Sequence, residues 1–411
     1  MQGSIGAERV VKVNGGAGVP PLLRVALDAT PLLGSPTGVG VFCLGALRAL
    51  GARPDLDVRA FAVSWRRRAG IGIHLPAAVA GAQRPMPARP LHALWGRGAW
   101  PPVEWFIGPV DVVHGTNFVV PPTRRAAQVV SVHDLTPLHH PELCNPATLA
   151  YPGLIRRALR RGAWVHTDSA FVAAEVVEAF GADPERVRVV PPGVPPLPPL
   201  APPAARELVE AFLPPGVARY VLAVGTAEPR KDLPGLVRAF DRLADRHGDL
   251  ALVLAGPPGW GEEALTSAVD AARAGARVVR TGWLESPVLA ALLQEASVLA
   301  FPSLYEGFGF PPLEAMAAGV PVVATRAGAL PEVLGDGAVL VAVGDDDGLV
   351  EALDQVLDDP ALRRRLVASG AARAASFSWE RCGEGLTRLY RDAAGAPGGP
   401  GGPGGPGGPG G

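Results

Sequence analysis

The sequence predicts an α/β protein with two Rossmann-like, doubly wound domains that face each other across a cleft. Three observations support this fold class. The chain has 411 residues, more than one hydrophobic core usually supports. Short apolar runs alternate with helical patterns, an order that produces parallel sheets with right-handed crossovers. A proline-rich segment then separates two sets of such units.

Short runs of branched apolar residues are predicted to form the strands of both sheets. In the first sheet they cover residues 23–27, 110–114, 128–132, 164–167 and 187–190. In the second they cover residues 220–224, 250–255, 278–281, 298–301, 322–324 and 338–341. Helices of the second set are predicted over residues 233–247, 262–274, 287–296, 311–318 and 348–357. Because such sheets bind ligands at the carboxyl ends of their strands, we expect the site to lie in the cleft.

Composition sets the expected domain boundaries. Residues 191–203 hold too many prolines for a helix or a central strand and are predicted to be a linker. We expect a first domain over residues 22–195, a second over 196–376 and a final helix over 377–394. Residues 1–21 and the Gly/Pro-rich residues 395–411 are expected to be disordered tails, because they cannot bury a core.

Composition also excludes several classes of protein. No apolar run approaches the ~18 residues of a membrane span, and the first residues lack a signal-peptide pattern, so we expect a cytoplasmic protein. Cys43, Cys144 and Cys382 are widely spaced, which excludes a disulfide framework and a thiolate zinc site. Residues 22–195 carry 18 Lys and Arg against 12 Asp and Glu, whereas residues 196–394 carry 18 against 26. The basic first half suits an anionic partner or membrane surface, although ordinary proteins show similar differences.

The strongest functional signal is the segment 302–319, PSLYEGFGFPPLEAMAAG, between a predicted strand and a predicted helix. Gly307 and Gly309, on either side of Phe308, let the backbone approach a ligand, and the free amides of the helix start attract an anion or a hydroxyl-rich group. Glu306 precedes the helix and Glu314 lies one turn inside it, where both can accept hydrogen bonds from vicinal sugar hydroxyls. Alternatively, both are ordinary acids at a helix N-terminus.

A second signal is the segment 224–233, VGTAEPRKDL, at the end of the first strand of the second domain. Gly225 ends the strand, and Arg230 and Lys231 follow at its carboxyl end. A forked guanidinium beside an ammonium is typical of a clamp for a diphosphate on which negative charge develops. The alternative is a solvated basic pair.

The first domain contributes weaker signals. Gly38, Val39 and Gly40 lie in a glycine-rich turn between a predicted strand and a helix predicted over residues 42–50, and such turns are common without a phosphate. His133 follows another strand, which places an imidazole at the edge of the same cleft. A lone histidine is more often structural than catalytic.

The remaining charged clusters are predicted to be structural. Asp55 and Asp57 match an Asp-x-Asp metal motif, and residues 345–347 form an acidic run, but a turn and a helix cap explain them, so no metal is predicted. The histidines at 133, 139 and 140 lack zinc-site spacing on one helix face. The basic stretches 66–68 and 156–161 lack interleaved aromatics, so we expect solvated faces and no nucleic-acid partner, with weak peripheral contact to anionic lipid as the minor alternative.

Taken together, these segments resemble glycosyltransferase family 4, the retaining enzymes of the GT-B fold, and in particular its mannosyltransferase-like branch. The resemblance covers residues 23–394 and rests on a Glu-x7-Glu element at Glu306 and Glu314, the basic pair, and the glycine-rich turn. Further similar segments are residues 189–194, 281–283, 328–333 and 377–380. The resemblance implies that the first domain binds the acceptor, that the second binds a nucleotide-sugar donor, and that the final helix packs back on the first domain.

The resemblance also implies roles for single residues. Glu314 would hold the ribose, Glu306 the hydroxyls of the donor sugar, and Gly307 to Gly309 the sugar through backbone amides. The basic pair would neutralise the departing diphosphate, and His133 would lie beside the donor sugar or the acceptor. One departure is Ala170, which stands where the branch usually has an acid, so no carboxylate contact is expected there.

The implied activity is retaining and metal-independent transfer of a hexose, mannose from GDP-mannose, to a glycan or lipid-linked acceptor without a cofactor. The leaving diphosphate would act as the base for the incoming hydroxyl. Alternatives are a UDP-sugar donor, a glycoside hydrolase using Glu306 and Glu314, a phosphorylase or epimerase, and a non-catalytic sugar-binding protein. The basic pair argues against hydrolysis, because a hydrolase has no diphosphate to neutralise. No motif specifies the acceptor or the oligomeric state.

Overall fold

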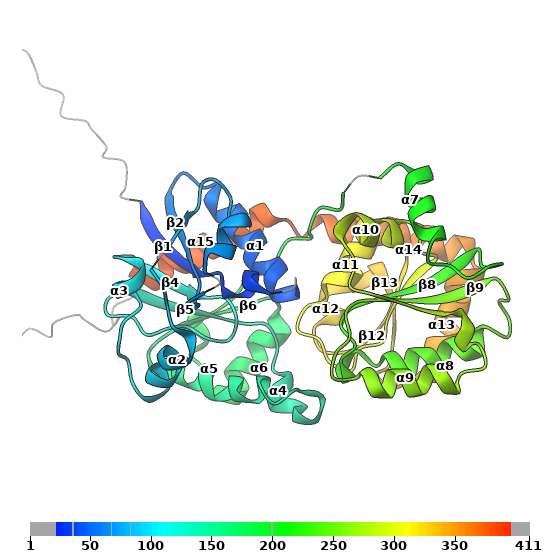
Figure 1. Ribbon diagram of the computed structural model, residues 1–411, viewed down its shortest axis with the longest axis horizontal. Helices are drawn as coiled ribbons and strands as arrows, with labels where there is room; N and C mark the ends of the chain where they lie inside the picture. Colours follow the sequence, from blue (N-terminus) through cyan, green and yellow to red (C-terminus); the bar gives the residue numbers. More distant parts are fainter. Residues whose placement is uncertain (1–21, 35–36, 67, 83, 199, 396–411) are drawn as a thin grey trace, which may run out of the picture.

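The structure is a computed structural model that describes residues 22–395 apart from residues 35–36, 67, 83 and 199. The chain forms two lobes, each built around a parallel sheet (Figure 1). The predicted α/β class with two Rossmann-like domains is therefore confirmed. The predicted tail over residues 1–21 lies outside the described residues, and so does the C-terminal tail except for Gly395, which ends the last helix.

In the first lobe, the described residues form a seven-stranded parallel sheet in the order β3-β2-β1-β4-β5-β6-β7. Its strands are β1 Leu23–Asp28, β2 Leu56–Phe61, β3 Ala80–Gly81, β4 Val112–Gly115, β5 Ala127–Val132, β6 Trp164–Thr167 and β7 Val187–Val189. The apolar runs do not predict β2 and β3. Asp57 and Arg59 interrupt the apolar residues of β2, and β3 has only two residues.

In the second lobe, the described residues form a six-stranded parallel sheet in the order β10-β9-β8-β11-β12-β13. Its strands are β8 Arg219–Val224, β9 Leu250–Ala255, β10 Val278–Gly282, β11 Val298–Phe301, β12 Val322–Thr325 and β13 Ala338–Val341. These bounds agree closely with the predicted strands, because each strand is an apolar run between polar or glycine-containing segments.

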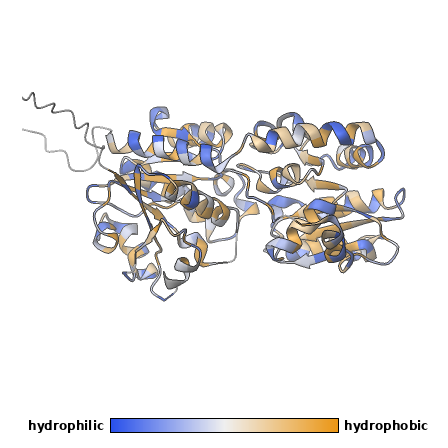
Figure 2. Cartoon of the chain, turned by 90° about the horizontal axis from the view of Figure 1, so that it is seen from above, coloured by the Kyte–Doolittle hydropathy of each residue, from blue (hydrophilic) through white to orange (hydrophobic). Residues whose placement is uncertain are grey.

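Helices cover both faces of each sheet and bury its side chains. In the first lobe, α1 Gly38–Gly51 and α15 Trp379–Gly395 pack on one face, and α2 Ala88–Arg97, α5 Tyr151–Arg160 and α6 Ala170–Phe180 on the other. In the second, α8 Leu233–Leu243 and α13 Asp346–Asp358 face α7 Pro202–Glu210, α10 Ser286–Glu295 and α11 Phe310–Ala317 across the sheet. Other helices are α3 Glu104–Ile107, α4 Thr136–His139, α9 Glu262–Ala271, α12 Leu330–Leu334 and α14 Pro360–Ala375. Figure 2 shows the strands as mainly hydrophobic and the hydrophilic residues on the outer helix faces.

Each sheet has a point where its strand order reverses. In the first lobe this point lies between the neighbouring strands β1 and β4, and in the second between β8 and β11. The loops that follow two such strands leave in opposite directions and open a crevice at the carboxyl edge of the sheet. The two crevices face each other, so the fold brings four loops from distant parts of the sequence to one cleft.

Two chain segments cross between the lobes, and they bond to each other. The Val194 amide donates to the Phe377 carbonyl at 3.1 Å. A Cβ atom on Gly193 would lie 2.3 Å from the Trp379 nitrogen, so the two segments approach this closely only because residue 193 is glycine. After the second crossing, α15 packs against α1, β4 and β5 of the first lobe.

Candidate functional site

The cleft between the lobes is a cavity of about 1280 Å³. One wall comes from the ends of β1, β4 and β5 and includes Asp28, Asn117 and His133. The other comes from the ends of β8, β9 and β11 and includes Gly225 and Glu306. A cavity of this size at two facing switch points is the expected position of a ligand site in doubly wound sheets.

The predicted basic pair lies in this cavity and contacts Glu306. Lys231 Nζ donates to Glu306 Oε1 at 2.5 Å, and Arg230 Nη1 lies 2.8 Å from the same oxygen. Arg230 Nε also donates to Glu228 Oε2 at 2.9 Å. The amide of Leu304 donates to the Arg230 carbonyl at 2.7 Å, so the loops after β8 and β11 are joined through the backbone as well.

The charged groups of this cluster shift one another's pKa values. Burial would raise the pKa of Glu306, but Arg230 and Lys231 outweigh burial and lower it to about 2. Burial lowers the pKa of Lys231, against the attraction of Glu306. The pKa of Arg230 is raised, because Glu306 and Glu228 outweigh its burial. The two cations are therefore paired with two protein carboxylates, Glu228 and Glu306.

Three glycines let the Glu306 loop pass close to neighbouring backbone. A Cβ atom on Gly307 would lie 1.7 Å from the His133 carbonyl oxygen, and one on Gly328 would lie 2.2 Å from that of Glu306. Gly309, with φ of 113°, turns the chain into α11, whose first turn contains Pro311 and Pro312. Phe308, between Gly307 and Gly309, is buried and packs edge-on against Phe310 and Phe377.

Glu314 lies on α11, as predicted, and lines the same cavity. Burial raises the pKa of its carboxyl group to about 7. Among the described residues, no lysine, arginine or histidine pairs with it. The carboxylate therefore stands beside the cluster as a hydrogen-bond acceptor that no protein cation neutralises.

The glycine-rich segment in the first lobe corrects one expectation. Helix α1 begins at Gly38, four residues before the predicted start, so Gly38, Val39 and Gly40 form its first turn rather than a loop ahead of it. Thr37 caps this turn by accepting from the Gly40 amide at 3.4 Å. A Cβ atom on Gly38 would lie 3.7 Å from the Phe310 ring, so the starts of α1 and α11 face each other across the cleft.

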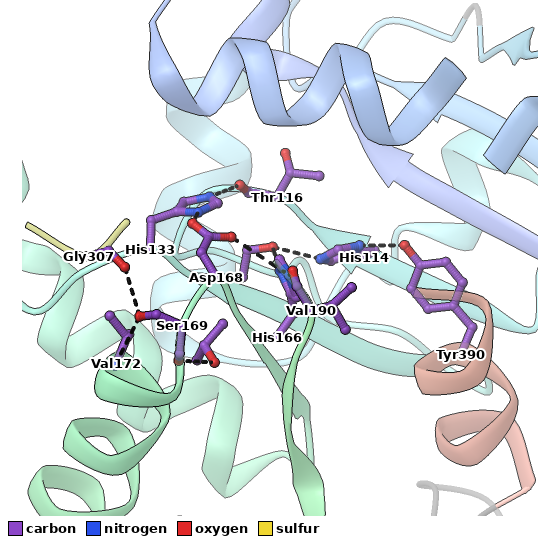
Figure 3. A network of polar contacts seen from close by, with 12 residues as sticks. His114, Thr116, His133, His166, Asp168, Ser169, Val172, Val190, Gly307 and Tyr390 are labelled. Carbon is purple, nitrogen blue, oxygen red and sulfur yellow. Dashed lines mark hydrogen bonds and ion pairs between the residues drawn. The ribbon is translucent and has the colours of Figure 1, made fainter. Parts of the chain in front are cut away.

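His133 lies in the cleft wall, but both of its ring nitrogens are occupied (Figure 3). Nδ1 lies 2.7 Å from Asp168 Oδ2, and Nε2 lies 2.8 Å from the Thr116 carbonyl oxygen. Burial opposes a charge on the ring, but the Asp168 carboxylate outweighs burial and raises the pKa of His133. The residue is therefore placed where the sequence predicts it, with a partner, Asp168, that no sequence pattern indicates.

Two further buried histidines continue this network towards α15 (Figure 3). His114 Nδ1 lies 2.7 Å from the Tyr390 hydroxyl, and Ser131 Oγ lies 2.8 Å from both His114 Nε2 and His166 Nδ1. His166 Nε2 lies 2.9 Å from the Val190 carbonyl, so it must donate there. Burial lowers the pKa of both rings, and both are therefore neutral.

Contacts across the cleft hold the lobes together beside the site. The Ser169 hydroxyl donates to the Gly307 carbonyl at 2.8 Å. The Glu332 carboxylate accepts from the amides of Ala170 and Phe171, at 2.8 and 2.9 Å, at the start of α6. At Ala170, where the family branch usually has an acid, the backbone amide contacts a carboxylate of the other lobe.

The basic stretch 156–161 differs from the prediction of a solvated face. Arg157 and Arg161 line the cleft, and Arg161 Nη2 donates to the carbonyls of Trp95 at 3.1 Å and Gly98 at 2.6 Å. No carboxylate within the described residues pairs with either arginine. Helix α5 turns one basic side towards the cavity, which a count of charges along the sequence cannot show.

The acidic motifs lie elsewhere. Asp55 pairs with Arg53 and Arg391, and Asp57 pairs with Arg59, at the amino-terminal end of β2 and away from the cleft. Asp345 caps α13 by accepting from the Gly348 amide at 2.8 Å. Both arrangements agree with the structural interpretation of these residues.

Two family models match the chain. The model described as "Glycosyltransferase Family 4" matches residues 36–196, and the one described as "Glycosyl transferases group 1" matches residues 206–373. O-antigen chain mannosyltransferase B of Escherichia coli is 30% identical over 278 residues, which cover 66% of this chain and 71% of that protein. MMP alpha-(1->4)-mannosyltransferase of Mycolicibacterium hassiacum is 36% identical over 247 residues, 58% of this chain and 56% of its own. D-inositol 3-phosphate glycosyltransferase of Acidothermus cellulolyticus is 29% identical over 428 residues, 94% of this chain and 93% of its own.

Solved structures show the same fold. Sucrose-phosphate synthase from Thermosynechococcus elongatus superposes with a TM-score of 0.71 at 20% identity and covers 90% of this chain and 98% of its own. A glycosyltransferase involved in lipopolysaccharide biosynthesis gives a TM-score of 0.66 at 18% identity, with coverage of 90% and 98%. An Anabaena protein solved with UDP-glucose gives 0.69 at 18% identity, with coverage of 90% and 100%.

Two Rossmann-like domains that face a shared cleft define the GT-B class of proteins, and this chain has that architecture. With the matches above, the chain belongs to the family 4 glycosyltransferases, as the resemblance in its motifs predicts. In the part of the chain that the structure describes, no helix combines the length and apolar character needed to cross a membrane.

Proposed function

We propose that the chain is a retaining, metal-independent hexosyltransferase that moves mannose from GDP-mannose to a glycan or lipid-linked acceptor. The observation that carries the proposal is the contact of Arg230 and Lys231 with Glu306 in the cleft wall. Two cations at the end of β8 suit a diphosphate, and the adjacent carboxylate suits sugar hydroxyls. The choice of mannose is supported by the names of two relatives, both mannosyltransferases.

The charges suit transfer better than hydrolysis. When the bond between sugar and diphosphate breaks, negative charge grows on the leaving phosphate, and Arg230 and Lys231 are placed to stabilise it. Glu306, with a pKa of about 2, remains ionised beside the positive charge that develops on the sugar. Glu306 therefore cannot be the proton-donating acid of a glycoside hydrolase, a role that only Glu314, with a pKa of about 7, could take. A hydrolase would also have no diphosphate for the buried cations Arg230 and Lys231 to neutralise.

The nucleoside part of the donor has two suitable neighbours in the cavity. Glu314, which pairs with no cation among the described residues, can accept hydrogen bonds from ribose hydroxyls. Trp283 lines the cleft after β10 and is 51% exposed, so its ring offers a face on which a nucleobase can stack.

The same cations support the proposal that the reaction needs no metal. Arg230 and Lys231 supply charge that a divalent ion would otherwise provide to a departing diphosphate. The Asp-x-Asp pair, Asp55 and Asp57, is engaged with arginines away from the cleft. Full activity in excess EDTA supports this part of the proposal, and loss of activity that Mg²⁺ or Mn²⁺ restores contradicts it.

The acceptor side combines positive charge with exposed aromatic rings. Arg157 and Arg161 line the cleft without carboxylate partners among the described residues. On the outer surface of the same lobe, Trp100 and Trp105 are 59% and 51% exposed, with ring centres 5.5 Å apart. Exposed tryptophans near arginines suit the interface of an anionic membrane, which is where a lipid-linked acceptor would lie. Co-sedimentation with anionic but not with neutral vesicles tests this peripheral contact.

The donor is tested by thermal shift with GDP, UDP, ADP and their sugar conjugates. A ligand at 100 times its Kd adds about 2.7 kcal/mol to the unfolding free energy. Selective stabilisation by GDP and GDP-mannose, followed by acceptor-dependent GDP release with the α-anomer retained in the product, supports the proposal. A preference for UDP moves the donor within the same fold, and no response to any nucleotide overturns the proposal.

A further inference from the structure

The His133 ring is held by two hydrogen-bond acceptors, the carboxylate of Asp168 and the backbone carbonyl of Thr116. Asp168 Oδ2 lies 2.7 Å from Nδ1, and the Thr116 carbonyl lies 2.8 Å from Nε2. A neutral imidazole has one protonated nitrogen and one lone pair. Beside an ionised Asp168 its lone pair would face an oxygen at hydrogen-bond distance, so this geometry is satisfied when both nitrogens carry a proton.

The rest of the surroundings fixes the ring in this state. Phe42 of α1 and Phe118 pack edge-on against it, with ring centres at 5.3 and 5.7 Å. Of the charged groups near the ring, Asp134 adds to the effect of Asp168, and the neutral rings of His114 and His166 lie beyond it. Because Nε2 is closed off by the Thr116 carbonyl, the ring is not placed to act as a general base.

Asp168 is only 3% exposed, although it lines both the main cleft and a smaller cavity. Its Oδ1 has no hydrogen-bond partner among the described residues, and Nε2 of the neutral His166 lies 3.8 Å from it. Towards α15 it faces the thiol of Cys382, whose pKa is raised by burial, so this group is neutral. The smaller cavity, of about 300 Å³, is also lined by Glu332, Arg373 and Arg381, and neither arginine is within ion-pair distance of Asp168. His133 is therefore the direct counter-ion of this carboxylate.

The three groups also follow three adjacent strands. Thr116 follows β4, His133 follows β5 and Asp168 follows β6. The Glu306–Gly307 loop of the other lobe rests on these strand ends: Gly307 packs against the His133 carbonyl, and Ser169, next to Asp168, donates to the Gly307 carbonyl at 2.8 Å. A change in the ion pair therefore reaches the loop that carries Glu306.

From this geometry we infer that Asp168 is a positioning residue that keeps the His133 ring doubly protonated. The fixed imidazolium connects the ends of three strands, and these strand ends form the surface on which the Glu306–Gly307 loop packs. Neither residue needs to contact the substrate for this role. Raising the pH until His133 loses its proton breaks the ion pair and weakens the connection between the strand ends that support the Glu306–Gly307 loop. The effect on turnover rests on the proposed transferase function, whereas the charge state of His133 does not.

The first test measures the charge state directly by NMR of protein labelled with ¹⁵N-histidine and needs no donor. We expect both nitrogens of His133 to be protonated at pH 7, while His114 and His166 each show one unprotonated nitrogen. The His133→Gln variant assigns the signals. A neutral His133 at pH 7 overturns the inference even if nucleotide binding is intact, and a charged His133 without any nucleotide binding refutes only the proposed function.

The second test compares pH profiles of kcat/KM. In Asp168→Asn the alkaline limb is expected to move down by about 1 to 3 pH units, because an adjacent opposite charge shifts a pKa by that amount. Asp168→Glu, which again supplies a carboxylate, should reverse most of this shift. Asp111→Asn, which removes the carboxylate paired with Arg24 away from the cleft, is the matched control and should leave the limb in place. An equal loss of activity at every pH in Asp168→Asn would show a merely structural residue.

Discussion

Lys231 Nζ and Glu306 Oε1 are 2.5 Å apart, which joins the loop after β8 to the loop after β11 at the point where the strand order of the second sheet reverses. Both side chains are almost fully buried. Buried ions persist only with a partner, so each residue makes the charged form of the other possible. Their pairing leads to the first prediction.

Glu306→Gln is expected to destabilise the fold at pH 7 by about 3 to 5 kcal/mol, because it leaves buried cations without their carboxylate. The pKa of Glu306 is about 2 in the folded chain against an ordinary 4.5. Its stabilising contribution is therefore complete above pH 4.5 and declines as the pH falls towards 2. Urea unfolding should show that the difference in the free energy of unfolding between wild type and variant becomes smaller below about pH 4.5. A constant gap would contradict the ion pair.

Arg230→Ala is expected to lower kcat/KM by a factor on the order of 10² or more, since it removes a cation beside the leaving group. Steady-state kinetics with the donor identified by thermal shift provides the measurement. Arg206→Ala, which removes a surface arginine paired with Glu210 on α7, should leave kinetics unchanged. Unchanged kcat/KM in Arg230→Ala would remove this residue from the donor site.

Glu314 makes donor binding depend on pH near neutrality. Its pKa of about 7 means that the carboxylate is only partly ionised at pH 7. Hydroxyl donors favour the ionised form, so donor affinity should rise as the pH increases through 7 and level off above it. Glu314→Gln should bind more weakly and with little pH dependence by calorimetry.

Glu314 also makes the free energy of unfolding depend on pH, and in the opposite direction to Glu306. Because the folded state favours the protonated form, the unfolding free energy falls as the pH rises from 4.5 to about 7. Glu314→Gln should remove this decline. Parallel declines in both proteins would show that another group causes it.

Gly307→Ala is expected to abolish most transfer activity while each lobe remains folded. Its Cβ would lie 1.7 Å from the His133 carbonyl, so the Glu306 loop must move away from the first lobe. Gly153→Ala, with no atom within 4 Å of the added carbon, is the control. Circular dichroism and activity measured together distinguish local displacement from unfolding.

Glu332→Ala is expected to favour separation of the lobes. The carboxylate caps the start of α6 from the opposite lobe, and its loss leaves two amides without their acceptor, at a cost of about 1 kcal/mol. Small-angle scattering should show a larger radius of gyration without ligand, which donor binding reverses. Glu351→Ala, an exposed change on α13, should scatter like the wild type.

Local patterns were sufficient for the strands and for the best-marked side chains. Continuous apolar runs identify nearly all strands, and the basic pair and the Glu-x7-Glu element follow strands that the fold brings to one cleft. Strand β2 is not predicted because Asp57 and Arg59 alternate with its apolar residues. The start of α1 escapes because glycines are poor helix formers, although Thr37 is a suitable cap.

The missed contacts join residues without a common local pattern. Asp168 is 35 residues from His133, and Glu332 lies 162 residues from the amide of Ala170. Such pairs depend on the register of parallel strands and on the distance between the lobes, and neither leaves a periodic trace in the sequence. The position of Arg157 and Arg161 in the cleft wall likewise depends on which side of α5 faces the cavity, and charges along the sequence do not show this.

The return of α15 to the first lobe has a consequence for the order in which the protein can mature on the ribosome. Leu386, Leu389 and Tyr390 fill the core beneath α1, yet they are synthesised after the whole second lobe. Until they emerge, one apolar face of the first sheet lacks its cover. Nascent chains that pause before residue 379 should therefore bind chaperones or aggregate, because exposed apolar surface of this kind drives misassembly.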